Sequence, residues 1–288
     1  MTPRRHLLAL DQGTSSSRAI VFDEGARPVG SAQHEVAATY PQPGWVEQDA
    51  EALWTTQLAA AREALTAAGI GATDLAAIGI ANQRETTVAW DRAGRPLAPA
   101  IVWQDRRTAD RCAQLRADGV EGAVRGRTGL LLDPYFSATK MAWLLEALPD
   151  GASRAAAGEI HLGTVDAWLA WRLTGGRTFA TDASNASRTM LLDLDRRAWS
   201  PAQLDLFDVP RAALPEVRAT DADFGASEAG LLGAEVPIRA MVGDQQGALF
   251  GGLCLSPGTA KNTYGTGCFL LETTGATPPE PPQGLLAT

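Results

Sequence analysis

Lysine, histidine and cysteine are scarce in this sequence, and each shortage argues against a class of chemistry. Lys140 and Lys261 are the only lysines in 288 residues, and neither follows a glycine, so the lysine of a GxxxxGK[ST] phosphate-binding loop is absent. The three histidines come without a GxSxG or HExxH motif, which gives no support to serine-hydrolase or zinc-protease chemistry. The three cysteines lie far apart without a CxxC pair, which indicates free thiols rather than a disulfide framework or a zinc site.

Excess positive charge and long apolar runs are also missing. Asp and Glu outnumber Lys and Arg by 33 to 25, and the net charge of −8 has the wrong sign for a surface that neutralises nucleic acid or anionic lipid. No apolar stretch approaches the length of a membrane span or of a signal-peptide core. We therefore expect a cytoplasmic protein with no nucleic-acid partner and no stable membrane association.

The apolar pattern that is present predicts a mixed α/β fold of one large domain or two ordinary ones. A helix is expected to begin after Asp49, which can cap it, and to end at Gly69. Strands are expected at 6–10, 18–22, 29–36, 75–82, 86–90, 99–103 and 236–244, and further helices at 106–115, 139–148, 164–173 and 245–253. Two last strands flank a glycine-rich turn at 264–268.

Two turns rich in glycine and hydroxyl groups follow predicted strands. The first, DQGTSSSR from Asp11 to Arg18, places a carboxylate and four consecutive hydroxyls at a strand end. Backbone N–H groups and hydroxyls of such a turn can hold phosphate oxygens without a lysine, and Asp11 suits Mg²⁺, which prefers carboxylate and water. The second, YGTGCF from Tyr264 to Phe269, follows the same logic. Each turn alone is equally well described as a polar hairpin loop.

Charged side chains follow two other predicted strands. Arg84 and Glu85 set a donor fork beside an acceptor, as a small polyol needs, although a surface ion pair of little energetic value is the alternative. Asp244 can accept a proton from an incoming hydroxyl, as the aspartate of kinases does, or can cap a helix. Trp103 and Tyr135 can form an apolar wall for a C–H face, or pack in the core.

Nine segments spread over residues 6–288 resemble the FGGY carbohydrate kinases, and among them the glycerol kinase branch. They read ALDQGTSSSRAIVFD, YPQPGWVEQD, IGIANQRETTVAWD, AIVWQDRRT, GLLLDPYFSATK, GTVDAWLAWRLTGG, TDASNASRTML, VGDQQGALFGG and AKNTYGTGCFLL. NQRETT and TDASNASRTML set that branch apart, because xylulose and gluconate kinases do not share them motif for motif. The resemblance implies an actin-like (ribonuclease H-like) ATPase fold of two similar domains, with ATP and substrate between them.

The same resemblance implies that ATP, with Mg²⁺, phosphorylates glycerol to sn-glycerol 3-phosphate. At the matching positions, the nucleotide phosphates would be contacted by Thr14, Ser15, Ser16 and Arg18, and from the second domain by Thr266 and Gly267. Mg²⁺ would be held by Asp11 and Asp244. Glycerol would be bound by Arg84, Glu85, Trp103, Tyr135, Asp244, Gln245 and Phe269. Asp244 would be the catalytic base.

The chain departs from the family pattern in length, because family members continue well beyond this point. We expect residues 1–250 to form the first domain and 251–288 to open a second, so that this chain alone binds glycerol weakly and turns over ATP negligibly. The full-length form is expected to be a homo-oligomer. Ala234 and Glu235 stand where some bacterial relatives bind fructose 1,6-bisphosphate, which predicts insensitivity to that inhibitor. Another FGGY kinase with a larger polyol substrate and a non-catalytic binding module are the alternatives.

Overall fold

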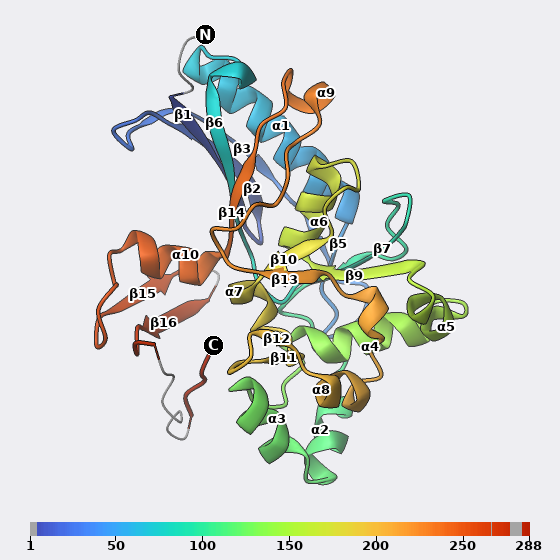
Figure 1. The fold of residues 1–288 in the computed structure, drawn as a ribbon. Helices are drawn as coiled ribbons and strands as arrows, with labels where there is room; N and C mark the ends of the chain where they lie inside the picture. Colours follow the sequence, from blue (N-terminus) through green and yellow to red (C-terminus); the bar gives the residue numbers. More distant parts are fainter. Residues whose placement is uncertain (1–4, 266, 277–283) are drawn as a thin grey trace.

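Two five-stranded sheets with helices around them make up the framework of the computed structural model, which describes residues 5–265, 267–276 and 284–288 (Figure 1). The first sheet has the order β14 (Ile238–Gly243), β6 (Leu75–Asn82), β1 (His6–Gln12), β2 (Ser16–Phe22), β3 (Pro28–Glu35). The second has the order β4 (Ala38–Thr39), β5 (Glu47–Gln48), β8 (Ala100–Ile101), β7 (Thr87–Asp91), β9 (Ile160–Thr164).

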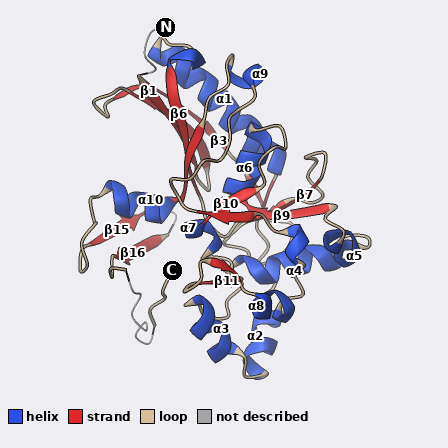
Figure 2. Ribbon diagram, in the orientation of Figure 1, coloured by secondary structure: helices blue, strands red, loops and turns tan. Residues whose placement is uncertain are grey.

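Short strand pairs and helices complete the structure (Figure 2). The pairs are β10 (Ala180–Asp182) with β13 (Glu216–Arg218), β11 (Leu192–Asp193) with β12 (Ala198–Trp199), and β15 (Ala260–Tyr264) with β16 (Cys268–Glu272). The helices are α1 (Ala50–Ala68), α2 (Ala109–Ala117), α3 (Glu121–Thr128), α4 (Ser137–Ala147), α5 (Gly151–Ala156), α6 (Val165–Leu173), α7 (Ala183–Ala186), α8 (Pro201–Leu206), α9 (Ala229–Leu232) and α10 (Asp244–Gly251), with 3-10 turns η1 (Ala72–Asp74) and η2 (Arg211–Ala213). Among the described residues, no helix is long and apolar enough to cross a membrane.

The direction of the strands in the first sheet places three loops side by side. Strands β1, β6 and β14 run parallel, whereas β2 and β3 continue the sheet as an antiparallel meander. In register, Gln12 lies beside Asn82, and Asn82 lies beside Gly243. The carboxyl ends of these three strands therefore form one edge, which is where open α/β sheets bind ligands.

Two hydrophobic cores hold the sheets and helices together. Leu8 and Leu10 of β1 and Ile78 and Ile80 of β6 are buried in the first core, together with one face of α1. The second core lies around the second sheet and α4, where Met141 is buried. The alternation of buried and half-exposed residues along β1 is what a strand with one face on a core produces.

Helix α1 has the ends that its sequence predicts. The Asp49 carboxylate accepts a hydrogen bond from the backbone N–H of Glu51 at 2.9 Å, and Gly69 ends the helix in the left-handed conformation at φ 67°. A glycine takes up that conformation without a steric penalty, so the two predicted ends are confirmed.

The packing of α1 against β3 depends on Gly30, because the helix backbone passes directly over it. A Cβ atom at this position would lie 2.5 Å from both the Ala64 carbonyl oxygen and the Ala68 amide nitrogen. We expect Gly30→Ala to lower the free energy of unfolding by about 2 kcal/mol, since backbone atoms must move to admit the methyl group. Urea denaturation measures this, with Gly122→Ala, where nothing lies within 4 Å of the added atom, as the matched control. Equal stabilities of the two variants would contradict it.

Candidate active site

The predicted charged residues gather where β6 and β14 end. Arg84 and Glu85 follow β6, Asp244 follows β14, and the three side chains come from adjacent parallel strands. Arg84 is 4% exposed and Glu85 is 1% exposed. They are therefore not a surface ion pair, and they do not pair with each other, because each has a different partner of opposite charge.

Arg84 pairs with Asp244 across the two strand ends. Its Nε lies 3.2 Å from Asp244 Oδ1, and its guanidinium lies 5.6 Å from the centre of the Phe269 ring. Asp244 is the first residue of α10, and Gly243 is the N-cap of this helix, so Asp244 is not the N-cap residue. Burial raises the pKa of the Asp244 carboxyl, and the Arg84 charge opposes that rise while Glu85 adds to it. A carboxylate with a raised pKa is better suited to accept a proton.

Glu85 pairs instead with Arg188, which comes from the segment after β10. Arg188 Nε donates a hydrogen bond to Glu85 Oε1 at 2.7 Å, and the two side chains are 6% and 2% exposed. Glu85 adopts a φ of 63°, a left-handed conformation that non-glycine residues rarely hold. Such backbone strain persists where surrounding contacts enforce it, and it is common at functional sites.

Three aromatic rings lie beside these charges. The Trp103 ring centre is 5.7 Å from that of Tyr135 and 6.1 Å from that of Phe269, both edge to face. Trp103 and Tyr135 are half-buried, and Tyr135 also packs against the second core. Burial raises the pKa of the Tyr135 hydroxyl to about 12, with Glu85 adding to the rise and Arg188 opposing it, so the group stays a neutral donor and acceptor. The rings therefore form an apolar wall next to the Arg84 and Glu85 side chains.

Hydrogen bonds from other elements fix the position of the loop between β1 and β2. Gln48 Nε2 donates to the Thr14 carbonyl at 2.5 Å, and Trp103 Nε1 donates to Thr14 Oγ1 at 2.8 Å. The Gly13 amide bonds the Ser16 carbonyl at 2.9 Å, and Ser15 is exposed. The Trp103 contact joins this hydroxyl-rich loop to the aromatic wall.

Arg18 lies in strand β2, outside the loop. Its guanidinium donates to Gln33 Oε1 at 2.8 and 3.0 Å on the exposed face of the neighbouring strand. In register it lies opposite Asp11. The structure thus places Thr14 and Ser15 in the turn and Ser16 at its end, where β2 begins. The Arg18 side chain instead forms hydrogen bonds with Gln33 on the surface.

The residues predicted to hold a Mg²⁺ ion, Asp11 and Asp244, lie near the carboxyl ends of β1 and β14. No three His, Cys, Asp or Glu side chains form a metal-binding group within the described ranges. Mg²⁺ usually keeps several waters and takes one or two carboxylates plus substrate phosphates, and these two carboxylates fit that pattern. Burial raises the pKa of Asp11, with Arg18 opposing the rise, so a cation nearby would favour its charged form.

Gln245 is buried behind Asp244 and receives a hydrogen bond from Lys261 of β15. Lys261 Nζ donates to Gln245 Oε1 and, at 2.6 Å, to Thr263 Oγ1. Burial lowers the pKa of Lys261, Asp244 opposes that change, and Arg84 adds to it. Lys261 was not predicted to be a site residue. The sequence marks it only as one of two lysines in the chain.

The two lysines of the chain are expected to differ sharply in reactivity. Burial lowers the pKa of both amines, that of Lys140 to about 8, so access decides the difference between them. Lys261 is half-buried, whereas Lys140 is fully buried and donates to the Tyr135 carbonyl at 2.6 Å. An amine reagent such as trinitrobenzenesulfonate is expected to modify Lys261 in the native protein. It is expected to reach Lys140 only through unfolding, at a rate lower by about three orders of magnitude or more. Peptide mapping by mass spectrometry checks this, with urea-unfolded protein as the control. Comparable labelling of Lys140 in the native protein would contradict it.

The second glycine-rich turn is described only in part. Thr266 lies outside the described residues, and Gly267 lies so close to Phe269 that a Cβ would be 2.6 Å from the ring. Cys254, Cys268 and Cys112 are free thiols, as predicted.

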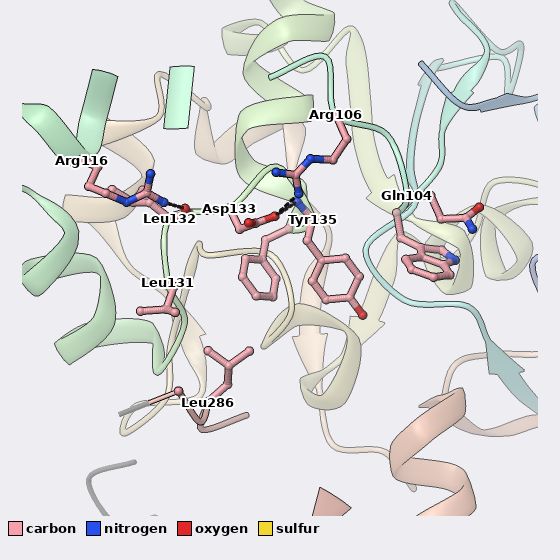
Figure 3. Close-up of a pocket in the computed structure, with 11 residues that line it drawn as sticks. Gln104, Arg106, Arg116, Leu131, Leu132, Asp133, Tyr135 and Leu286 are labelled. Atoms are coloured by element: carbon pink, nitrogen blue, oxygen red, sulfur yellow. Dashed lines mark hydrogen bonds and ion pairs between the residues drawn. The ribbon is translucent and has the colours of Figure 1, made fainter. Parts of the chain in front are cut away.

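A cavity of about 600 Å³ opens beside the aromatic wall (Figure 3). Trp103 and Tyr135 line it, together with Leu132 and an ion pair of Arg106 with Asp133 at 2.9 Å. The Arg84, Glu85 and Asp244 side chains are not among its lining residues. The cavity therefore shares one wall with the strand-end site and extends away from the charged pairs.

Solved structures with similar folds include a Plasmodium falciparum glycerol kinase with ADP and a xylulose kinase from Rhodospirillum rubrum. The first has a TM-score of 0.87 at 32% identity, covering 92% of this chain and 53% of that one. The second has a TM-score of 0.85 at 24% identity, covering 95% and 56%. The fold is thus the actin-like, ribonuclease H-like ATPase fold of these kinases.

The sequence profile of the FGGY family of carbohydrate kinases, N-terminal domain, matches residues 6–251, and this chain belongs to that family. A glycerol kinase of Methylibium petroleiphilum is 59% identical over 284 residues, which are 98% of this chain and 57% of that protein. Glycerol kinase 1 of Pseudomonas aeruginosa is 55% identical, covering 98% and 58%. The chain thus spans less than two thirds of the length of these relatives.

Proposed function

We propose that the protein transfers the γ-phosphoryl group of ATP to glycerol, forming sn-glycerol 3-phosphate and ADP. The observation that carries this proposal is the pairing of Arg84 with Asp244 next to Glu85 and the aromatic rings, at the carboxyl ends of the parallel strands β6 and β14. A small polyol needs buried donors and acceptors for its hydroxyls and an apolar surface for its carbons. The relatives named glycerol kinase support the same substrate.

In the proposed mechanism, Asp244 accepts the proton of a terminal hydroxyl as that oxygen attacks the γ-phosphorus in line. Arg84, Glu85, Tyr135 and Gln245 hold the hydroxyls, and Trp103 and Phe269 flank the carbon chain. The turn of Thr14, Ser15 and Ser16 donates to phosphate oxygens, with Arg18, Thr266 and Gly267 as the further proposed contacts. Mg²⁺, held by Asp11 and Asp244, would neutralise charge on the transferring phosphates.

A panel of polyols tests the substrate. Calorimetric titration of the chain with glycerol, dihydroxyacetone, erythritol and xylulose is expected to show binding of glycerol in preference to the others, and loss of that binding in Arg84→Gln. Tighter binding of a larger polyol would favour another FGGY kinase activity, and binding of none would favour a non-catalytic module. That this chain alone binds glycerol weakly and turns over ATP negligibly stays a prediction, checked by glycerol-dependent ADP release.

We also propose that residues 1–250 form one domain and that 251–288 open a second. The β15–β16 pair joins neither five-stranded sheet, and Phe250, Leu253, Tyr264 and Leu270 around it are 71 to 80% exposed. Limited proteolysis with chymotrypsin is expected to cut first within this region and to leave a stable product ending between 250 and 255. An initial cut inside the first sheet would contradict the boundary.

Homo-oligomerisation, a cytoplasmic location and insensitivity to fructose 1,6-bisphosphate stay predictions about the whole protein.

A further inference from the structure

The segment between β10 and β11 carries the motif TDASNASRTML, to which the sequence assigns no role, and it reaches the ends of two strands of the site. Asp182 Oδ2 accepts a hydrogen bond from Ser184 Oγ at 2.7 Å, and that hydroxyl oxygen accepts one from the Gly243 amide at 2.8 Å. Gly243 directly precedes Asp244. The beginning of the segment therefore fixes the backbone that carries the proposed base.

The middle of the segment is tied to β6 in the same way. Asn185 and Asn82 exchange two side-chain hydrogen bonds of 2.9 and 3.1 Å, both fully buried. Asn82 ends β6, two residues before Arg84. The segment is thereby held against both strand ends before its last charged residue, Arg188, reaches the site.

Arg188 contacts two of the proposed glycerol ligands at once. It donates to Glu85 Oε1 at 2.7 Å, and its guanidinium lies 5.6 Å from the centre of the Tyr135 ring, where its charge opposes the rise in the pKa of the Tyr135 hydroxyl. It also lies 5.0 Å from the centre of the Phe136 ring. We propose that Arg188 is a positioning residue that fixes Glu85 and Tyr135 for the hydroxyls of glycerol, an inference that rests on the proposed function.

The physical reason is that the position of the buried Glu85 carboxylate depends on a fixed hydrogen-bond donor. Glu85 is 1% exposed and its φ of 63° is strained, so its orientation needs a partner that is itself held in place. The nearby buried lysine does not replace Arg188, because Lys140 Nζ is bonded to the carbonyls of Tyr135 and Phe136. A planar guanidinium offers several donors in fixed directions, and here it bonds the Glu85 carboxylate while it lies beside the Tyr135 ring.

A double-mutant cycle separates positioning from direct contact with glycerol. Arg188→Gln is expected to weaken glycerol binding about 10- to 100-fold, as loss of a hydrogen bond to a charged group does. Because Arg188 acts through Glu85, the variant E85Q/R188Q is expected to bind within about twofold of E85Q alone. Arg188→Lys is expected to recover part of the affinity. Arg172→Gln is the matched control, since Arg172 also pairs with a glutamate, Glu51, and lies over the rings of Trp54 and Trp168, none of which is a proposed glycerol ligand.

A spectroscopic signature adds a measurement that does not depend on glycerol. The chain has three tyrosines, so ¹³C-labelling of tyrosine Cζ gives three signals, with Tyr135→Phe to assign one. Arg188→Gln is expected to shift the Tyr135 signal, and Arg172→Gln to leave it unchanged. Where Arg188→Gln fails to fold because Glu85 is left buried and unpaired, E85Q/R188Q removes that charge and is compared with E85Q.

The outcomes distinguish this inference from the proposed function. Absence of glycerol binding in the unmodified chain would overturn the proposed function, and the Tyr135 signal would still decide the role of Arg188. Additive losses in R188Q and E85Q, or an unchanged Tyr135 signal in R188Q, would overturn the positioning role.

Discussion

Asp244→Asn is expected to lower kcat for glycerol phosphorylation by about 10²- to 10⁴-fold, in any form of the protein that phosphorylates glycerol. Asparagine keeps the shape and one acceptor oxygen but cannot take up the proton of the attacking hydroxyl. That oxygen can still lie near Arg84 Nε, which is 3.2 Å from Asp244 Oδ1 in the unmodified protein. Because Asp244 is also a proposed ligand of glycerol and of Mg²⁺, kcat at saturating glycerol and Mg²⁺ is the measure of its role as the base.

The pH dependence of the rate gives the same residue a second signature. Burial raises the pKa of Asp244, so the base is protonated and inactive at pH values where an ordinary aspartate is still charged. The rate of the unmodified enzyme should fall as pH drops through that raised pKa, and Asp244→Asn should lose this acid limb. Steady-state kinetics from pH 5 to 8 checks both effects. Asp49→Asn, which replaces one good helix cap by another, is the control, and equal rates in the two variants would show that Asp244 is not the base.

The sequence predicted the local elements well because each has a local cause. The apolar runs at 6–10 and 75–82 and the capped amphipathic helix after Asp49 are properties of neighbouring residues, and β1, β6 and α1 confirm them. The helix expected at 106–115 begins later, at Ala109, because 106–108 form turns held by Asp105 and Gly44. Helices α3, α5, α7, α8 and α9 were not predicted; none is longer than 8 residues, which leaves too few turns for a clear apolar repeat.

The partners within the site could not be predicted, because they come from residues far apart in sequence. Arg84 and Glu85 are neighbours in sequence, which suggested one ion pair. In the structure each has its own partner. Arg84 pairs with Asp244, 160 residues further along the chain, and Glu85, whose φ is strained, pairs with Arg188. A local pattern contains no record of which strands become adjacent, and here the order β14-β6-β1 decides it. Arg188 was not predicted as a site residue, although the branch-specific motif TDASNASRTML contains it.

Asp166→Asn is expected to change how stability depends on pH, because Asp166 is a fully buried carboxyl that pairs with no cationic side chain in the described part of the chain. Its two oxygens accept hydrogen bonds from Thr164 Oγ1 at 2.5 Å and from Thr181 Oγ1 at 2.6 Å. Burial, with the nearby charge of Asp182, raises the pKa of Asp166 from 3.8 to about 6. The folded protein thus holds this proton more tightly than the unfolded chain does.

The sign of the effect follows from that difference in proton binding. Between pH 4 and 6 the folded state binds more protons, so this group contributes stability at acidic pH and loses it as pH rises through about 6, by ~3 kcal/mol in total. Asp166→Asn removes this dependence, so the variant should be most destabilised relative to the unmodified protein near pH 4.5 and least near pH 7.5. Urea unfolding at both values measures the change. Asp23→Asn should show the opposite trend, because hydrogen bonds from the Arg27 backbone and side chain lower the pKa of Asp23, so its contribution is lost as pH falls. A constant difference between Asp166→Asn and the unmodified protein across this range would mean that Asp166 is charged in the fold throughout, with Thr164, Thr181 and the Asp182 amide stabilising the anion.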